Sequence, residues 1–225
     1  KTIAYLVAAL PIARSQGKKL VIASATVALQ EQLILRDLPD IMKHSRMDFN
    51  ARLAKGRGRY LCLAKLDLQL SGRHTSSIIP LYPDEQLMES QEKLLEISET
   101  MVDFLNRDQW DGDFDSWPGV IDIDTQRLLA TDQNQCIGRL CPHVNQCSFF
   151  RARDGLEDAE VIVTNHDLVL ADLRLGGGKI LPAPQDCYYI FDEGHQLPAK
   201  CLDHFTHRFH AGSISGWISD TNQWI

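Results

Sequence analysis

Three short apolar runs, each ending in polar residues, constrain the fold of this chain most. They are KKLVIAS (18–24), AEVIVTNH (159–166) and CYYIFDEGH (187–195). Short apolar runs of this kind are typical of strands buried on both faces of a parallel sheet. The residues that follow them deserve scrutiny because a parallel sheet carries its chemistry at the carboxyl ends of its strands.

Helical patterns lie between these runs. Residues 1–16 and 26–38 have helical spacing, and Thr26 is placed to cap the second helix. From about residue 62 to 105 the sequence is again helical, and residues 106–120 are rich in turn formers. Strand, helix, long interruption, strand, loop, strand is the pattern of an α/β fold with an insertion.

Size and composition exclude several classes of protein. The chain has 225 residues, of which 44% are hydrophobic, and this is enough for one or two globular domains with a core. The longest apolar run, Ile3 to Ala13, is too short to span a bilayer and contains Pro11. Because the chain begins at Lys1 within an apolar pattern, we expect it to be a piece of a longer protein.

Charge is segregated along the chain. The formal net charge is −7, but residues 84–124 hold thirteen Asp and Glu residues against Lys93 and Arg107, a net of −11. The remaining residues therefore carry about +4 and are compatible with nucleic-acid binding. We expect the acidic stretch to form an outer face or a surface for a protein partner.

Asp192 and Glu193 end the third apolar run. Adjacent carboxylates at the end of a buried strand are costly unless a cation or a hydrogen-bond network uses them. In nucleotide hydrolysis the first such carboxylate holds Mg²⁺ and the second orients and deprotonates the attacking water. The alternative is an exposed turn with two solvated acids; the apolar strand before the pair favours the nucleotide site.

Lys1 and Thr2 open the first expected helix. A phosphate-binding loop ends in Lys followed by Ser or Thr, and this pair opens a helix. If the chain starts inside such a loop, Lys1 reaches the β- and γ-phosphates of ATP and Thr2 ligates Mg²⁺. An ordinary helix start is the alternative.

Several stretches together resemble the first motor domain of DinG-type DNA helicases, relatives of the XPD helicases in superfamily 2. The matching stretches are Lys1–Thr2, ASATVALQEQL (23–33), GRGRYLC (56–62), CIGRLCPHVNQC (136–147), AEVIVTNHDLVLADL (159–173) and FDEGHQLP (191–198). The family has Asp-Glu-Ala-His in the last of these, and this chain has Gly194 at the third position. That position makes no ligand in such motors.

The resemblance implies a RecA-like parallel sheet interrupted by an iron–sulfur domain. It divides the chain into the first part of the motor (1–55), the inserted domain (56–155), the second part of the motor (156–200) and the start of an arch-like region (201–225). It also implies a second motor outside this chain, without which the chain should be inactive. His195 is expected to couple nucleotide state to DNA motion across the motor cleft. Asn165 and His166 either line the same cleft or, for His166, form a satisfied buried histidine.

The cysteines follow the same resemblance. Cys62, Cys136, Cys141 and Cys147 are similar to the [4Fe–4S] ligand set of these helicases, although four thiolates can also hold Zn²⁺. A structural role is expected first and redox sensing second. Cys187 and Cys201 are interpreted as unligated.

Basic residues surround these cysteines, interleaved with aromatic residues that could stack on bases: Lys55, Arg57, Arg59, Lys65, Arg139, His143, Arg151 and Arg153, with Tyr60, Phe149 and Phe150. We predict DNA contacts by Arg57, Arg59 and Tyr60, and weaker ones by Thr26 and Gln30. For Phe149 and Phe150 we favour packing around the cluster.

Two functions follow from these observations. The first is a fragment of an ATP-dependent 5′→3′ DNA helicase that acts on single-stranded, forked or branched DNA in repair or replication. The bacterial likeness of the family implies a cytoplasmic, nucleoid-associated protein. The second is a non-catalytic, metal-binding DNA or protein adaptor that keeps a degenerate motor.

Overall fold

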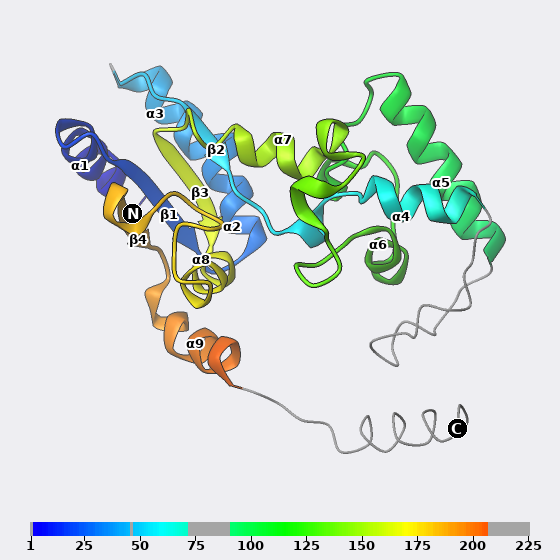
Figure 1. Ribbon diagram of the computed structural model, residues 1–225. Helices are drawn as coiled ribbons and strands as arrows, with labels where there is room; N and C mark the ends of the chain where they lie inside the picture. Colours follow the sequence, from blue (N-terminus) through cyan, green and yellow to red (C-terminus); the bar gives the residue numbers. More distant parts are fainter. Residues whose placement is uncertain (1, 46, 72–90, 207–225) are drawn as a thin grey trace. The chain divides into compact units, whose positions relative to one another are not determined.

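The computed structural model describes residues 2–45, 47–71 and 91–206 (Figure 1). The chain forms two compact units. The sheet unit comprises the residues up to Gly56 together with Phe150–Thr206, and the cysteine unit comprises Arg57–Phe149. Their assignment to a motor and an inserted cluster domain stays a prediction.

The sheet unit contains a four-stranded parallel sheet in the order β2-β3-β1-β4. Its strands are β1 (Lys19–Ser24), β2 (Ala51–Leu53), β3 (Val161–Asn165) and β4 (Cys187–Phe191). The α/β prediction is therefore confirmed in its parallel sheet. Three strands coincide with the apolar runs, and β2 was not predicted.

Helices cover both faces of this sheet (Figure 1). The helices of the sheet unit are α1 (Thr2–Ser15), α2 (Val27–Gln32), α3 (Leu38–His44), α8 (His166–Arg174) and α9 (Leu197–Phe205). The helix α7 (Ser148–Asp154) follows the cysteine segment. The helix predicted over 26–38 extends further, because a π-helical turn over Leu33–Asp37 joins α2 to α3.

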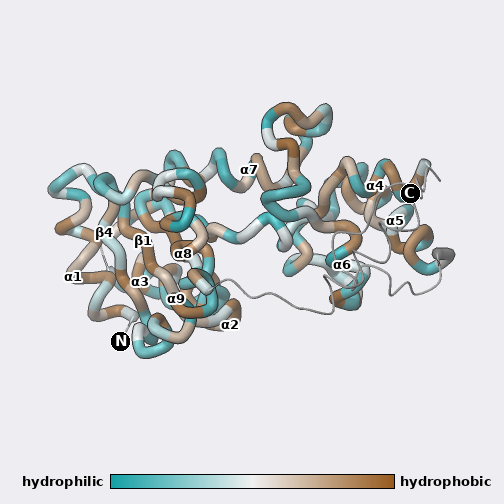
Figure 2. The backbone as a smooth tube through the Cα atoms, turned by 60° about the horizontal axis from the view of Figure 1, so that its bottom comes forward, coloured by the Kyte–Doolittle hydropathy of each residue, from teal (hydrophilic) through white to brown (hydrophobic). Residues whose placement is uncertain are grey.

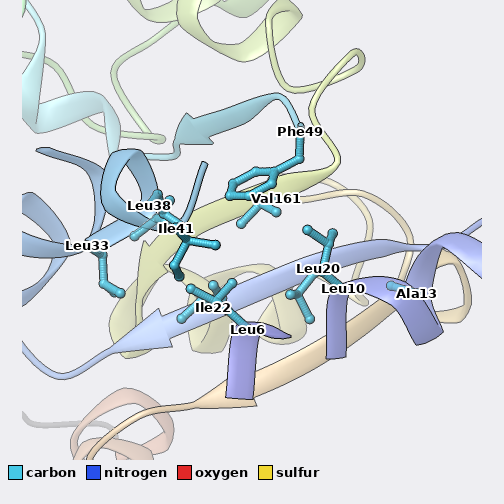
Figure 3. Close-up of a cluster of buried hydrophobic side chains, with 11 residues drawn as sticks. Leu6, Leu10, Ala13, Leu20, Ile22, Leu33, Leu38, Ile41, Phe49 and Val161 are labelled. Carbon is cyan, nitrogen blue, oxygen red and sulfur yellow. The ribbon is translucent and has the colours of Figure 1, made fainter. Parts of the chain in front are cut away.

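The sheet buries a separate hydrophobic cluster on each face. On one face, Leu6 and Leu10 of α1 meet Leu20 and Ile22 of β1 (Figure 3). On the other, Val21 packs with residues of α8 and the segments before β3. Alternate residues of β1 thus point to opposite faces, and each fully buried Leu or Ile contributes about 1.5–3 kcal/mol.

A buried carboxylate fixes the loop that leads into β4. Asp172 is 1% exposed, and its oxygens accept hydrogen bonds from the backbone N–H groups of Gly178, Lys179 and Ile180 at 2.9, 2.8 and 2.5 Å. Gly178 has φ +74°, a conformation that favours glycine. This anchor sets where β4 begins and so where Asp192 follows it.

The cysteine unit is mainly helical in its described part. Its helices are α4 (Leu63–Leu70), α5 (Gln91–Asn106) and α6 (Ile123–Leu129). Hydrophobic and hydrophilic residues alternate along α5 in Figure 2, as expected of a helix with one face in a core. That core includes Leu66, Met101 and Trp110. The first seven residues of the acidic stretch, 84–90, lie outside the described residues.

None of the helices within the described residues is both long and apolar enough to traverse a bilayer.

Candidate functional site

The polar ends of three strands lie at one edge of the sheet. β1 pairs with both β3 and β4, and its register places Ser24 opposite Asn165 and Ala23 opposite Phe191. Because all the strands run in parallel, the residues that follow them share this edge. Asp192 comes directly after β4, and its backbone N–H donates to the carbonyl of Ala23 at 2.9 Å.

Glu193 has an unusual backbone conformation. Its φ of +54° and ψ of +40° place it in the left-handed region, which residues with a Cβ adopt rarely. Its N–H donates to Oδ1 of Asp192 at 3.1 Å. Unusual backbone conformations persist only where the surrounding structure holds them in place, and they cluster at functional sites. Here the turn directs the chain away from the strand and leaves the Glu193 side chain half-buried.

His195 lies next to Glu193. Its Nδ1 is 3.3 Å from Oε2 of Glu193, and its side chain is 71% exposed. The geometry thus links the second carboxylate of the pair to an exposed imidazole. The predicted role of His195 in coupling nucleotide state to DNA motion stays a prediction.

Tyr5 was missed from the sequence; it lies on α1, three residues after Thr2. Lys1 lies outside the described residues, whereas Thr2 begins α1. The phenol oxygen of Tyr5 is buried. Burial raises the pKa of Tyr5, the Thr2 side chain lowers it, and the charges of Asp192 and Asp37 raise it further.

His166 is fully buried at the same edge, with 0% of its surface exposed. Its Nε2 lies 3.2 Å from the carbonyl oxygen of Ala23 and 2.9 Å from that of Asp192. Burial agrees with the interpretation as a buried histidine, but among the described residues only Nε2 is hydrogen-bonded and Nδ1 has no partner, so the histidine is not fully satisfied. Asn165, just before it, caps α8 through its side-chain oxygen, which accepts from Leu168 N at 2.7 Å.

The residues predicted to contact DNA differ in their solvent exposure and in the contacts they already make. Tyr60 is 6% exposed and packs edge-on against Phe149, with ring centroids 5.8 Å apart. The guanidinium of Arg57 lies over the Phe149 ring at 4.8 Å, and that of Arg59 is paired with Asp115. Burial of Phe149 fits the packing interpretation. For Arg57, Arg59 and Tyr60, DNA binding stays a prediction.

Thr26 and Gln30 belong to the helix after β1. The hydroxyl of Thr26 accepts from Leu29 N at 3.3 Å, so the predicted cap is confirmed. Gln30 is only 2% exposed. A role of these two side chains at the DNA backbone stays a prediction, and contact by Gln30 would require its side chain to leave the interior.

The four predicted cluster ligands lie in the same unit of the structure. Cys62, Cys136, Cys141 and Cys147 are half-buried free thiols of the cysteine unit. Burial raises the pKa of Cys62, the N–H groups of Lys65 and Ala64 lower it, and nearby Cys136 raises it. The N–H of Gly138 points at Cys136 Sγ, 3.4 Å away. Four thiols, two of which have backbone N–H groups directed at their sulfurs, are a donor set suited to an iron–sulfur cluster.

A bound cluster also requires that the four sulfurs lie around a common point. Within residues 2–45, 47–71 and 91–206, no three Cys, His, Asp or Glu side chains converge where one metal ion could be held. The donor chemistry thus fits the predicted cluster, but the sulfurs are not gathered around a common point. Cys187 is buried in β4, and burial raises the pKa of its thiol to about 11, as expected of a core cysteine.

Comparison with known proteins identifies relatives along the whole chain. No protein-family model matches. A protein of Photobacterium profundum named ATP-dependent DNA helicase DinG is 37% identical over 227 residues, which cover 100% of this chain and 32% of that protein. Proteins of the same name from Escherichia coli K12 and Salmonella typhimurium are 36% and 35% identical over 203 residues, or 90% of this chain.

These relatives confirm the predicted resemblance. They are about three times as long as the chain, which spans 32% of the first and 28% of the others.

Proposed function

We propose that this chain, a relative of the DinG-type ATP-dependent DNA helicases along its whole length, is the first motor of such an enzyme together with an inserted iron–sulfur domain. One observation carries the proposal most. Asp192 and Glu193 follow β4 at the carboxyl edge of the parallel sheet, where the backbone N–H of Asp192 donates to the Ala23 carbonyl near the end of β1. RecA-like motors place at this edge the carboxylates that hold Mg²⁺ and orient the attacking water.

Each of these side chains would have a separate role in ATP hydrolysis. Lys1 would contact the β- and γ-phosphates, and the oxygens of Thr2 and Asp192 are hard ligands of the kind that Mg²⁺ prefers. Mg²⁺ supplies neutralisation of the phosphate charge. Glu193 would orient the attacking water and accept its proton, and its left-handed backbone directs the side chain for that task. His195, next to Glu193, would couple this step to DNA movement.

The cysteine unit would hold a [4Fe–4S] cluster through Cys62, Cys136, Cys141 and Cys147. The chemistry of four thiols with backbone N–H groups directed at two of them supports this. Cys62 and Cys136 are separated by 73 residues in the sequence. A cluster that cross-links them would offset the entropy of closing so long a loop, so its first role would be structural.

DNA would be the polymer on which the motor acts. We propose single-stranded DNA, within forked or branched substrates, with 5′→3′ movement as in the family that the chain resembles. Basic residues beside the cysteines, among them Arg57 and Arg139, would neutralise phosphates. The acidic stretch 84–124 would face away from DNA or bind a protein partner.

The experiment is ATP hydrolysis by the full-length protein with and without single-stranded DNA. The wild-type protein should hydrolyse ATP, and DNA should stimulate it. Glu193→Gln should bind ATP with wild-type affinity and lose at least about 100-fold in turnover, because the general base is removed. Glu157→Gln, which changes an exposed carboxylate of the same unit, is the matched control.

Two results would contradict the proposed function. Normal turnover by Glu193→Gln would remove Glu193 from its proposed role. Absence of hydrolysis by the wild-type protein, with DNA binding retained, would favour the non-catalytic adaptor.

A further inference from the structure

The ring of His166 donates at a point where three segments of the sheet meet. Its Nε2 lies within hydrogen-bond distance of two backbone carbonyls, those of Ala23 and Asp192. Carbonyl oxygens only accept, so Nε2 must carry a proton and share it between them. The second ring nitrogen, Nδ1, is buried and has no hydrogen-bond partner among the described residues. The two carbonyls therefore define the tautomer of His166.

These bonds join segments that are far apart in the sequence. Ala23 lies near the end of β1, His166 begins α8 directly after β3, and Asp192 follows β4. The Ala23 carbonyl also accepts the backbone N–H of Asp192 at 2.9 Å. One imidazole thus fastens the carboxyl ends of three neighbouring strands to one another.

His166 affects Glu193 through a single peptide group, the one that joins Asp192 to Glu193. The carbonyl of Asp192 and the N–H of Glu193 belong to the same planar peptide group. His166 holds the oxygen of this group, and Oδ1 of Asp192 accepts from its N–H at 3.1 Å. Both polar atoms are fixed immediately before a residue with φ +54°, so the plane cannot rotate without breaking a buried hydrogen bond.

We propose that His166 is a positioning residue for ATP hydrolysis. It does not touch the nucleotide; it holds the Asp192–Glu193 peptide in the orientation that aims the Glu193 carboxylate at the attacking water. The inference rests on the proposed function. It predicts that His166 affects the chemical step more than the affinity for ATP, because the phosphates and Mg²⁺ would be bound by the side chains of Lys1, Thr2 and Asp192 and not by the backbone carbonyl that His166 holds.

A purely structural role makes a different prediction. If His166 only fills space and ties strands together, its replacement should lower stability and weaken ATP binding and turnover in parallel. Thr164 offers a matched control, because it lies in β3 two residues before His166 and is also 0% exposed. Its hydroxyl donates to the Ala54 carbonyl at 3.2 Å, towards β2 and away from Asp192. Thr164→Val therefore removes a buried hydrogen bond without disturbing this peptide.

The test uses the full-length protein with single-stranded DNA and measures ATP affinity, kcat and the midpoint of thermal unfolding. His166→Phe keeps an aromatic ring but removes the donor. We expect kcat to fall about 10- to 100-fold with an ATP dissociation constant within about twofold of wild type. His166→Gln, whose amide can donate to both carbonyls, should recover part of kcat. Thr164→Val should keep wild-type kcat.

Three results would overturn the proposal. One is a wild-type kcat in His166→Phe. Another is a parallel loss of ATP affinity and kcat in both His166 variants. If the wild-type protein itself does not hydrolyse ATP, the proposed function fails and this inference with it; hydrolysis by wild type with an unaffected His166→Phe rejects the inference alone.

Discussion

The guanidinium of Arg14 meets the carboxylate of Glu160 in two parallel hydrogen bonds, from Nε to Oε1 at 2.7 Å and from Nη2 to Oε2 at 2.9 Å. The same guanidinium bonds the carbonyl of Asp48, and Glu160 accepts the N–H of Asn50 at 3.3 Å. The pair therefore fastens the end of α1 to the start of β3 and to the segment before β2. The hydrogen bond from Arg14 lowers the pKa of Glu160, and burial opposes this.

The lowered pKa predicts an acid-sensitive contribution to stability. A carboxyl group with a lower pKa in the folded chain stabilises it fully above the unfolded value, about 4.3 for Glu, and loses this contribution as the pH falls through the folded value. Wild type should exceed Glu160→Gln in stability at pH 7, and the difference should shrink below about pH 4. The effect is modest because the side chains are 38% and 40% exposed.

Urea denaturation between pH 3 and pH 7 measures this difference, with Glu157→Gln as an exposed control. A gap between wild type and Glu160→Gln that stays constant over this range would contradict the assignment.

Asp172 should be important for the loop before β4. Asp172→Asn replaces one acceptor oxygen with an NH₂ group that faces the N–H groups of Gly178, Lys179 and Ile180. We expect a loss of about 2 kcal/mol or more in unfolding free energy, since a buried donor is left without an acceptor. Asp186→Asn, an exposed change in the same loop, should lie within about 0.5 kcal/mol of wild type in the same denaturation curves. Equal stabilities would refute the anchoring role.

Gly194 should tolerate a side chain. Its φ is not positive, and a Cβ added there meets no atom within 4 Å. Gly194→Ala should therefore keep DNA-stimulated ATP hydrolysis within about twofold and raise stability by about 0.4–1 kcal/mol, because alanine restricts the unfolded chain. Gly178→Ala is the contrast, since it has φ +74° and its Cβ would lie 3.2 Å from Ala183 Cα. Loss of hydrolysis in Gly194→Ala would show that glycine itself is needed.

The cysteine set predicts the metal content of the full-length protein. Purified without oxygen, it should be brown, with about four iron and four sulfide per chain and broad absorption near about 400 nm. Serine at Cys62, Cys136, Cys141 or Cys147 should lower the iron content and the midpoint of unfolding, as should removal of iron by a chelator. Cys201→Ser, at a half-buried free thiol outside the set, should change neither. A colourless protein loaded with zinc would contradict the assignment.

The three apolar runs made much of the sheet predictable. Buried parallel strands have few polar residues, so β1, β3 and β4 stand out in the sequence. In contrast, β2 has only three residues, Ala51–Leu53, with the charged Arg52 at its centre. So short a segment has no period that could distinguish it from a loop.

The candidate site was predictable only where one segment carries the signal. Asp192 and Glu193 follow an apolar strand and could be found by that context. The positions of Tyr5 and His166 depend on contacts between segments that the sequence separates widely. For the same reason local composition suggested that Tyr60 and Gln30 are accessible, whereas packing from other segments buries them.

The pairing of the strands has a consequence for biosynthesis. Each ladder that the structure describes, β1 with β3, β1 with β4 and β2 with β3, joins a strand made before the cysteine unit to one made after it. While the ribosome is still producing residues 57–149, none of these three ladders can form. Leu20 and Ile22 of β1 therefore lack the neighbours β3 and β4 until residues 161–191 have emerged, and during that interval their exposed apolar surface would favour aggregation unless chaperones shield it.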